Sequence, residues 1–265
     1  MKDFFHMKIL YAGSSQSSSL ILESLIAGSN EVIGVISQPD RRSKRRASAE
    51  PSYVSSVAEK NGVNVYKPKN LDKNFKETIL QLKFDILLVA AYGKILPEWL
   101  LKTPSKDSIN IHYSLLPKYR GASPIQSALL NGEKITGISI MRMTAGLDEG
   151  PVFVFHTQEI LNSDNKITLE KKLTSLCIKN IEKDLSNIYL DKIVPIKQDV
   201  KNISYCKKID KLSGRINFDQ KKIIDNYKSV LETLDKDTPG IKSMIKSAFI
   251  SSSMGPSAQI TVTEA

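Results

Sequence analysis

The strongest constraint on the fold of this chain is a repeated alternation between short apolar runs and segments with helical spacing. Residues 8–13 and 85–91 are almost continuously apolar, which is typical of strands buried on both faces of a sheet. Residues 18–27 and 71–82 instead place apolar side chains three or four positions apart, as helices with one buried face do. This alternation predicts an α/β fold with a doubly wound, mostly parallel sheet. Further strands are expected at 31–37, 63–66, 108–113, 136–143 and 152–158, and further helices at 51–60, 124–130 and 168–190.

The composition of the 265-residue chain is that of a water-soluble globular protein, with 41% apolar residues. No apolar run approaches the roughly 18 residues that cross a bilayer, and residues 1–6 lack the apolar core of a secretory signal. We therefore expect a cytoplasmic protein without a membrane partner. Cys177 and Cys206 have no partner spacing, and three histidines are too few for a His-rich site, so neither a disulfide framework nor a metal is expected.

The net charge of +10 is the most suggestive global property of the chain, because basic proteins attract polyanions. General solubility explains the same number equally well. Part of the charge is concentrated in residues 38–46 (QPDRRSKRR), directly after the second expected strand, at the edge where doubly wound sheets bind ligands. Arginine forks suit phosphate groups, whereas a solvated charge run is the alternative interpretation. The five basic residues are Arg41, Arg42, Lys44, Arg45 and Arg46.

A serine-rich segment, residues 13–19 (GSSQSSS), follows the first expected strand. It matches neither the dinucleotide pattern GxGxxG nor the phosphate-binding pattern GxxxxGK[ST], so the sequence gives no reason to expect NAD or ATP. Hydroxyls and amides at a helix start can bind an anion, but a helix cap alone also explains these serines.

The most informative motif for chemistry is Asn110-Ile-His112 at the end of an expected strand. Residues two apart on a strand point to the same face, so an amide and an imidazole lie side by side. An amide N–H can stabilise a developing oxyanion while histidine transfers a proton near neutral pH, which suits acyl transfer. A histidine with a purely structural role is the alternative. Asp148 is the expected carboxylate partner that orients the imidazole; Glu149 competes for that role, and an Asx-type turn is the alternative for Asp148.

Four motifs together resemble the methionyl-tRNA formyltransferase family over residues 7–240. They are QPDR (38–41), AAYGKILP (90–97), INIHYSLLPKYRGASPIQSALLNGEKITGISIMRM (109–143) and GLDEG (146–150). Asn-x-His with a later Asp is shared by folate-dependent formyltransferases in general. QPDR and AYGKILP narrow the resemblance to the enzymes that act on tRNA.

The resemblance implies a Rossmann-like catalytic domain over 7–190, a linker over 191–207 and a second domain, similar to an OB-type barrel, from 208. It implies transfer of formyl from 10-formyltetrahydrofolate to the free amine of initiator methionyl-tRNA, for translation initiation. In this reaction Asn110 would donate to the oxyanion, His112 would relay a proton and Asp148 would fix the imidazole tautomer. The folate-binding residues implied are Tyr92, Gly93, Ile95, Leu96, Pro97, Ser114, Leu115, Leu116 and Pro117, and the implied tRNA contacts are the five basic residues of 41–46.

The sequence also departs from the family pattern. Glu149 and Pro151 stand where the family usually has Thr and Asp, and an extra carboxylate beside Asp148 would perturb His112. Residues 211–240 resemble the start of the second domain, but 241–265 do not resemble its remainder, so we expect a truncated or atypical tRNA-binding domain over 208–265. We expect a monomer.

Two alternatives to the tRNA enzyme stay open at this stage. A formyltransferase for a small substrate, such as a nucleotide sugar or glycinamide ribonucleotide, would share the three catalytic residues but would not need the basic loop. A non-catalytic RNA-binding remnant would keep the fold, but joint retention of Asn110, His112 and Asp148 argues against it.

Overall fold

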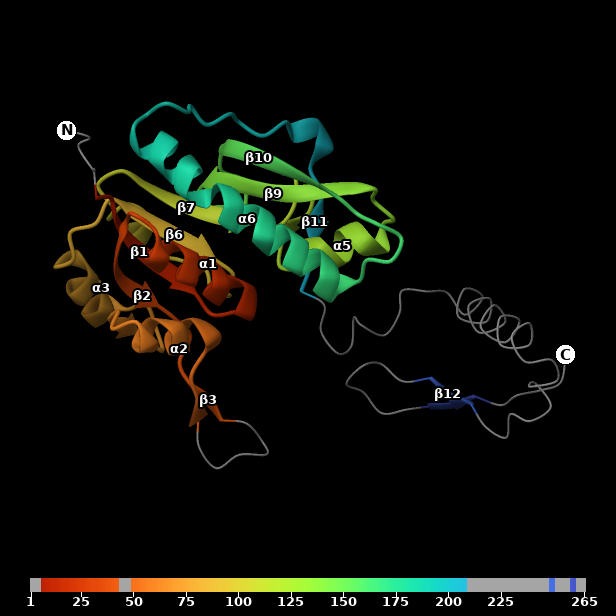
Figure 1. Cartoon of the computed structure of the whole chain (residues 1–265), viewed down its shortest axis with the longest axis horizontal. Helices are drawn as coiled ribbons and strands as arrows, with labels where there is room; N and C mark the ends of the chain where they lie inside the picture. The colour runs from red at the N-terminus through yellow and green to blue at the C-terminus, as the bar shows by residue number, and fades with distance from the viewer. Residues whose placement is uncertain (1–5, 43–48, 209–247, 251–257, 261–265) are drawn as a thin grey trace, which may run out of the picture. The chain divides into compact units, whose positions relative to one another are not determined.

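The computed structural model describes residues 6–42, 49–208, 248–250 and 258–260 (Figure 1). Contacts within the chain divide it into two compact units, residues 1–207 and residues 208–265. Each unit is described by itself.

The first unit is built on a seven-stranded sheet in the order β10-β9-β7-β6-β1-β2-β5. The strands from β5 to β7 pair in parallel, whereas β9 runs antiparallel to both β7 and β10. The prediction of a mostly parallel α/β sheet is therefore confirmed. Its strands are β1 (Lys8–Gly13), β2 (Glu31–Ile36), β5 (Val65–Tyr66), β6 (Ile86–Ala90), β7 (Asp107–His112), β9 (Ile135–Arg142) and β10 (Val152–Glu159).

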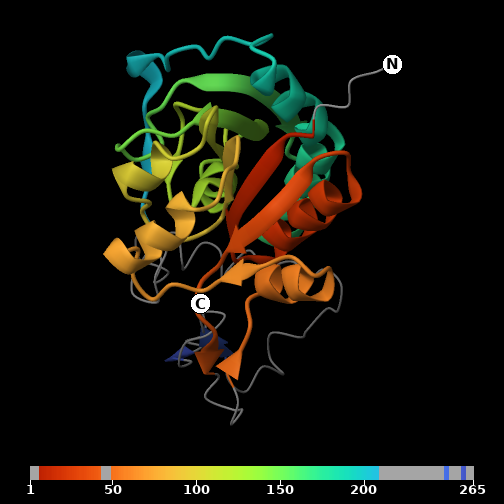
Figure 2. The ribbon, with the colours of Figure 1, turned by 90° about the vertical axis from the view of Figure 1, so that its left-hand side faces the viewer.

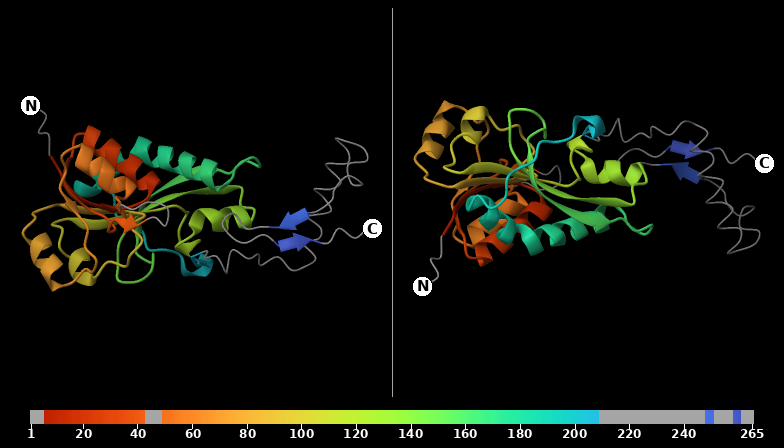
Figure 3. Two further views of the ribbon diagram at one scale, coloured as in Figure 1. Left: turned by 90° about the horizontal axis from the view of Figure 1, so that it is seen from below. Right: turned by 90° about the horizontal axis from the view of Figure 1, so that it is seen from above.

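Helices cover both faces of this sheet, which explains why its central strands are apolar throughout (Figure 3). On one face, α1 (Gln16–Ala27), α2 (Tyr53–Lys60), α5 (Pro124–Leu130) and α6 (Lys166–Tyr189) contribute to the larger hydrophobic cluster. On the other face, α3 (Lys73–Leu80) and α4 (Glu98–Leu101) enclose a smaller cluster. The sheet is thus fixed between two apolar layers, and its carboxyl edge is left for the loops.

The turn from β1 into α1 shows how the sequence sets the geometry of this edge. A Cβ atom at Gly13 would lie 2.0 Å from Ser18 Oγ and 2.9 Å from the Ala90 carbonyl oxygen, so only glycine fits there. Ser15 caps the helix by accepting a hydrogen bond from the Ser18 amide at 3.1 Å. The serine-rich segment therefore caps the helix, which was one of the two interpretations of its sequence; the other was an anion site.

Every predicted helix and strand is present, with ends displaced by at most two residues. The structure adds short elements that the sequence pattern did not indicate: α4, the hairpin of β3 (Arg41–Arg42) and β4 (Ala49–Glu50), and the parallel pair of β8 (Arg120–Gly121) and β11 (Tyr205–Cys206). Figure 2 shows the β3–β4 hairpin projecting beyond the end of β2. Such two-residue strands carry no periodicity, so only tertiary contacts define them.

The segment that follows α6 returns along the first unit before the second unit begins. Ile196 forms a β-bridge with Val152, the 3₁₀ turn Val200–Asn202 follows, and β11 then pairs with β8. In the second unit the described residues form one antiparallel pair, β12 (Ala248–Ile250) with β13 (Ala258–Ile260). The expected OB-type barrel and residues 211–240 lie outside the described residues. In the described part of the chain, no helix is both long and apolar enough to span a membrane.

Candidate active site

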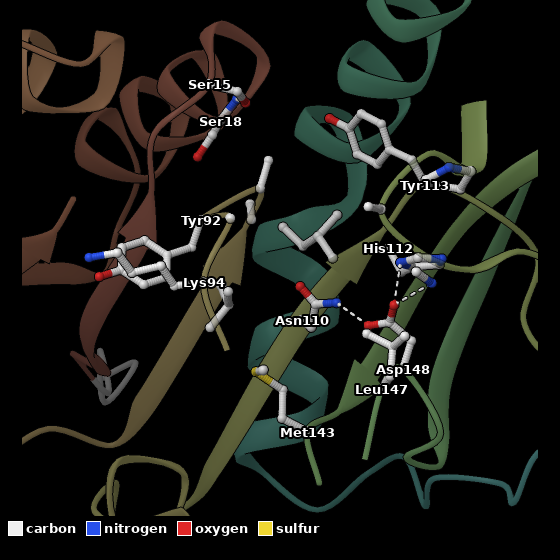
Figure 4. A pocket seen from close by; sticks show the side chains of 18 of the residues that line it. Ser15, Ser18, Tyr92, Lys94, Asn110, His112, Tyr113, Met143, Leu147 and Asp148 are labelled. Atoms are coloured by element: carbon white, nitrogen blue, oxygen red, sulfur yellow. Dashed lines mark hydrogen bonds and ion pairs between the residues drawn. The ribbon is translucent and has the colours of Figure 1, made fainter. Parts of the chain in front are cut away.

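A cavity of about 600 Å³ opens at the carboxyl ends of β6 and β7 (Figure 4). It is lined by residues 89–96, 110–113 and 143–148, together with side chains from the start of α1 and the first turns of α6. This volume is within the range of small-molecule sites, and the carboxyl edge of a doubly wound sheet is where such sites form.

The three predicted catalytic residues meet at this cavity. Asn110 and His112 lie two apart on β7, and Asp148 comes from the loop between β9 and β10 (Figure 4). Asn110 Nδ2 donates to Asp148 Oδ1 over a long 3.4 Å, and His112 Nδ1 lies 3.6 Å from Asp148 Oδ2. The side chain of His112 is 6% exposed and that of Asp148 16% exposed. The neighbouring Glu149 is exposed and does not line the cavity.

Both nitrogens of the His112 ring have defined surroundings. Nε2 lies 2.8 Å from the backbone carbonyl of Tyr119, and because a carbonyl only accepts, Nε2 carries a hydrogen. The tautomer is therefore fixed by Tyr119 and not, as expected from the sequence, by Asp148. Asp148 Oδ2 accepts a 2.8 Å hydrogen bond from the Gly121 amide, which holds the carboxylate beside Nδ1.

The backbone is strained at three positions around the cavity. Ala91, Tyr119 and Asp148 all have left-handed conformations, with φ of 48°, 60° and 49°. Aspartate tolerates this region, but a tyrosine there is uncommon, and such strain collects at functional sites. Two of these strained residues contact His112: the Tyr119 carbonyl faces Nε2, and the Asp148 carboxylate faces Nδ1.

The predicted folate residues separate into two groups. Tyr92, Gly93, Ile95 and Leu96 line the cavity, whereas Pro97 is the N-cap of α4 and is not among the lining residues. Ile95 is 87% exposed, so an apolar side chain stands free at the rim. In the part of the chain that is described, the hydroxyl of Tyr92 is the one buried side-chain N or O atom without a hydrogen-bond partner, and burial raises its pKa to about 12.

The second group, Ser114, Leu115, Leu116 and Pro117, does not line this cavity. Ser139 Oγ donates to the Ser114 carbonyl at 2.6 Å and accepts from the Leu116 amide at 3.0 Å. Leu116 also packs with Met141 and Val152. In this structure the segment anchors the loop to β9.

A second cavity of about 510 Å³ adjoins the first and shares Ser15, Ala91, Tyr92 and Gly93 with it. Its lining includes Gln38, Pro39 and residues 50–53, which flank the β3–β4 hairpin. Arg41 and Arg42 form β3, so the described end of the basic run emerges beside this cavity. Lys44, Arg45 and Arg46 lie outside the described residues.

Besides the backbone groups of Tyr119 and Gly121, two side-chain features of the site were missed by sequence reasoning. Lys166 and Glu170, an ion pair on α6, line the cavity from the far side. Gln198 reaches the loops of both Tyr119 and Asp148 from the segment after α6. Neither feature belongs to a short motif. Among the described residues, no three His, Cys, Asp or Glu side chains are grouped so that they could hold a metal ion.

Comparison with known proteins gives one consistent result. The profile of the family described as formyl transferase matches residues 7–181. The methionyl-tRNA formyltransferase of Dictyoglomus thermophilum is 42% identical over 214 residues, covering 80% of this chain and 68% of the relative. That of Caldicellulosiruptor saccharolyticus is 37% identical over 249 residues, covering 92% of this chain and 78% of the relative.

Among solved structures, similar folds occur in formyltransferases with other acceptors. A sugar N-formyltransferase from Shewanella matches with a TM-score of 0.64 and 16% identity, covering 98% of both chains. A phosphoribosylglycinamide formyltransferase from Anaplasma phagocytophilum matches with a TM-score of 0.59 and 25% identity, covering 78% of this chain and 97% of the other.

Proposed function

The chain belongs to the methionyl-tRNA formyltransferase family, and from that premise we propose that its cavity transfers a formyl group from 10-formyltetrahydrofolate to the amine of initiator methionyl-tRNA. The observation that carries this proposal is the convergence of Asn110, His112 and Asp148 on one face of a ligand-sized cavity. An amide donor, an imidazole and a carboxylate are the groups that acyl transfer needs.

The reaction forms one C–N bond and breaks another. A free α-amine has a pKa of roughly 8, so a substantial neutral fraction is available to attack the formyl carbon near neutral pH. Attack turns the formyl oxygen into an oxyanion, and Asn110 donates to it through the amide hydrogen that Asp148 does not use. The bond from the formyl carbon to the folate nitrogen then breaks, and the proton of the amine passes to that nitrogen.

His112 carries this proton through Nδ1. Its Nε2 hydrogen is committed to the Tyr119 carbonyl, so Nδ1 is the nitrogen with a lone pair toward the cavity. A ring protonated at both nitrogens is stabilised by the Asp148 carboxylate 3.6 Å away.

The cavity suits a folate donor in size and lining. A bicyclic ring and its aryl side chain fit a site of about 600 Å³, and apolar side chains with backbone groups line the 89–96 side. We propose Tyr92, Gly93, Ile95 and Leu96 as donor contacts; the roles of Pro97 and of Ser114–Pro117 stay predictions.

We propose that the acceptor tRNA is held by charge from the basic run. The β3–β4 hairpin begins beside the second cavity, which is continuous with the catalytic one through shared residues. Lysine and arginine contacts to phosphates position a nucleic acid without reading its bases. Residues 208–265 would serve as an atypical tRNA-binding domain.

A transfer assay with radiolabelled formyl donor tests the reaction. Initiator methionyl-tRNA should be formylated, elongator methionyl-tRNA should be a poorer acceptor, and His112→Ala should lower the rate of product formation by about 10²- to 10⁴-fold. Glycinamide ribonucleotide and an amino-sugar nucleotide serve as competing acceptors. Faster formylation of either small acceptor than of the tRNA would replace this proposal with the small-substrate alternative.

The basic run is tested by tRNA binding. Replacing Arg41, Arg42, Arg45 and Arg46 with Ala should weaken binding and reduce the slope of log affinity against log salt by about 1 for each phosphate that the variant no longer neutralises. Unchanged affinity and slope would show that the basic run does not contact tRNA and is only a solvated charge cluster.

A further inference from the structure

The side-chain amide of Gln198 joins two loops that are far apart in sequence. Its Oε1 accepts from Arg120 Nε at 3.0 Å and from Arg120 Nη2 at 2.8 Å. Its Nε2 donates to the carbonyl of Asp148 at 2.8 Å and to the carbonyl of Gly150 at 2.7 Å. Both hydrogens of the amide nitrogen and both acceptor sites of its oxygen are thereby used.

Arg120 supplies the other half of this connection. The residue is 5% exposed, and its guanidinium lies 6.0 Å from the centre of the Tyr205 ring. A buried guanidinium needs acceptors in a fixed geometry, and Gln198 provides one that two of its N–H groups reach together. Arg120 stands between the two residues whose backbone groups define the site, Tyr119 and Gly121.

The same segment holds this loop at its backbone. Ser204 accepts from the Tyr119 amide through Oγ at 2.8 Å and from the Arg120 amide through its carbonyl at 2.9 Å. The Ala122 amide donates to the Cys206 carbonyl at 3.0 Å. The loop is therefore immobilised by residues that follow α6, more than 80 positions along the chain.

We propose that Gln198 is a positioning residue for formyl transfer. The two groups that face the nitrogens of His112 are the Tyr119 carbonyl and the Asp148 carboxylate, and they belong to different loops. Gln198 contacts both loops directly, so its amide fixes the distance between them together with the hydrogen bond from the Gly121 amide to Asp148. Because neither its oxygen nor its nitrogen is free for a substrate, Gln198 acts through His112 and Asp148. This inference rests on the proposed function for its kinetic readout.

Substitution kinetics test the role. In Gln198→Ala, kcat for formyl transfer should fall by about 10- to 100-fold, while KM for the folate donor and for methionyl-tRNA stays within about twofold. Gln198→Glu keeps an acceptor for Arg120 but loses both donors to the Asp148 loop, so Arg120 stays paired while kcat should still be reduced. Gln158→Ala is the matched control, since the half-buried Gln158 lies outside both cavities and its side-chain amide donates to the carbonyl of its own neighbour, Glu159.

A spectroscopic measurement gives a readout that does not depend on turnover. The chain has three histidines, so imidazole ¹⁵N signals can be assigned with His112→Gln. Wild type should show His112 in the Nε2–H tautomer, Gln198→Ala should shift its signals toward a tautomer mixture, and Gln158→Ala should leave them unchanged.

Two results would overturn the proposal. One is a Gln198→Ala protein with kcat within twofold of wild type and an unchanged His112 tautomer. The other is a loss of activity that Gln198→Glu fully restores, because a mere anchor for Arg120 would behave in that way. If wild type formylates no acceptor, the proposed function fails, whereas the tautomer shift in Gln198→Ala still reports on the contact.

Discussion

The described residues of the first unit include two histidine–aspartate pairs, and the pairs differ in whether the histidine ring hydrogen-bonds directly to the carboxylate. His156 on β10 and Asp184 on α6 form a close pair, with Nε2 2.7 Å from Oδ2. His112 and Asp148 are 3.6 Å apart, and the outer nitrogen of His112 is bound to a backbone carbonyl instead. Neither member of the close pair lines either cavity.

The difference shows what a catalytic arrangement requires beyond residue type. In the His156 pair, the carboxylate is satisfied by direct contact with the ring, and the contact fastens a strand to a helix. In the His112 pair, the Gly121 amide and the Asn110 side chain satisfy the carboxylate, and the Tyr119 carbonyl satisfies one ring nitrogen. Nδ1 is left near a charge but without a hydrogen bond, which is the state a proton carrier needs.

The largest expected effect is on kcat, and it should distinguish replacement of the His112 ring from replacement of the His156 ring. His112→Gln should lower kcat for formyl transfer by about 10²- to 10⁴-fold, because general acid–base catalysis is worth that much. His156→Gln should leave kcat within twofold and lower the melting temperature. Steady-state kinetics and thermal melts of both proteins check this, and similar kinetic losses in the two would erase the distinction between the pairs.

The next largest effect is expected at Asn110, whose side-chain amide contacts the same carboxylate as His112, that of Asp148. Asn110→Ala removes the proposed oxyanion donor, and loss of one such donor costs about 10²- to 10³-fold in kcat. KM for the folate donor should change little, since the interaction strengthens only in the transition state. Asn61→Ala is a suitable control, because the exposed Asn61 lies at the end of α2 and its side chain donates to the Val57 carbonyl of the same helix. A rise in KM for the folate donor with an unchanged kcat would show that Asn110 contributes to binding and not to the transition state.

Much of this comparison was accessible from the sequence. Period-two geometry placed Asn110 beside His112, and the apolar alternation placed both at the carboxyl edge of a mostly parallel sheet. The sequence did not decide between Asp148 and Glu149, because a left-handed turn at Asp148 determines which carboxylate faces the cavity.

The rest was not accessible, for physical reasons that differ from residue to residue. The Tyr119 carbonyl is a backbone atom that every residue has, so no residue type signals its role. Gln198 lies 78 positions from Arg120 and 50 from Asp148, and its role depends on the return path of the chain after α6. A two-residue pair such as β8 and β11 leaves no periodic trace.

A smaller effect, on stability, is expected at the partner of His156. Asp184→Ala removes a buried acceptor from the ring, which should cost about 1–3 kcal/mol in free energy of unfolding. Formyl transfer below the melting temperature should stay within twofold, because the pair lies outside the cavities. Chemical denaturation measures the first quantity, and a matching Asp148→Ala protein should show the reverse pattern. Equal stability losses would mean that both pairs are structural.

The smallest expected effect separates the backbone of Tyr119 from its side chain. Its hydroxyl donates to Glu133 at 2.7 Å, and burial, with that hydrogen bond, raises its pKa to about 12. Tyr119→Phe keeps the carbonyl that holds His112, so kcat should not change, whereas stability should fall by about 1 kcal/mol.

The pH dependence of this small difference has a defined sign. The folded-state pKa of Tyr119 lies above the unfolded value of roughly 10, so its contribution is complete below pH 10 and is lost as the pH rises toward 12. The stability gap between wild type and Tyr119→Phe should therefore be constant from pH 6 to 9 and narrow above pH 10. Denaturant titrations across this range measure the gap. A loss of kcat in Tyr119→Phe would show that the side chain, and not only the carbonyl, positions His112.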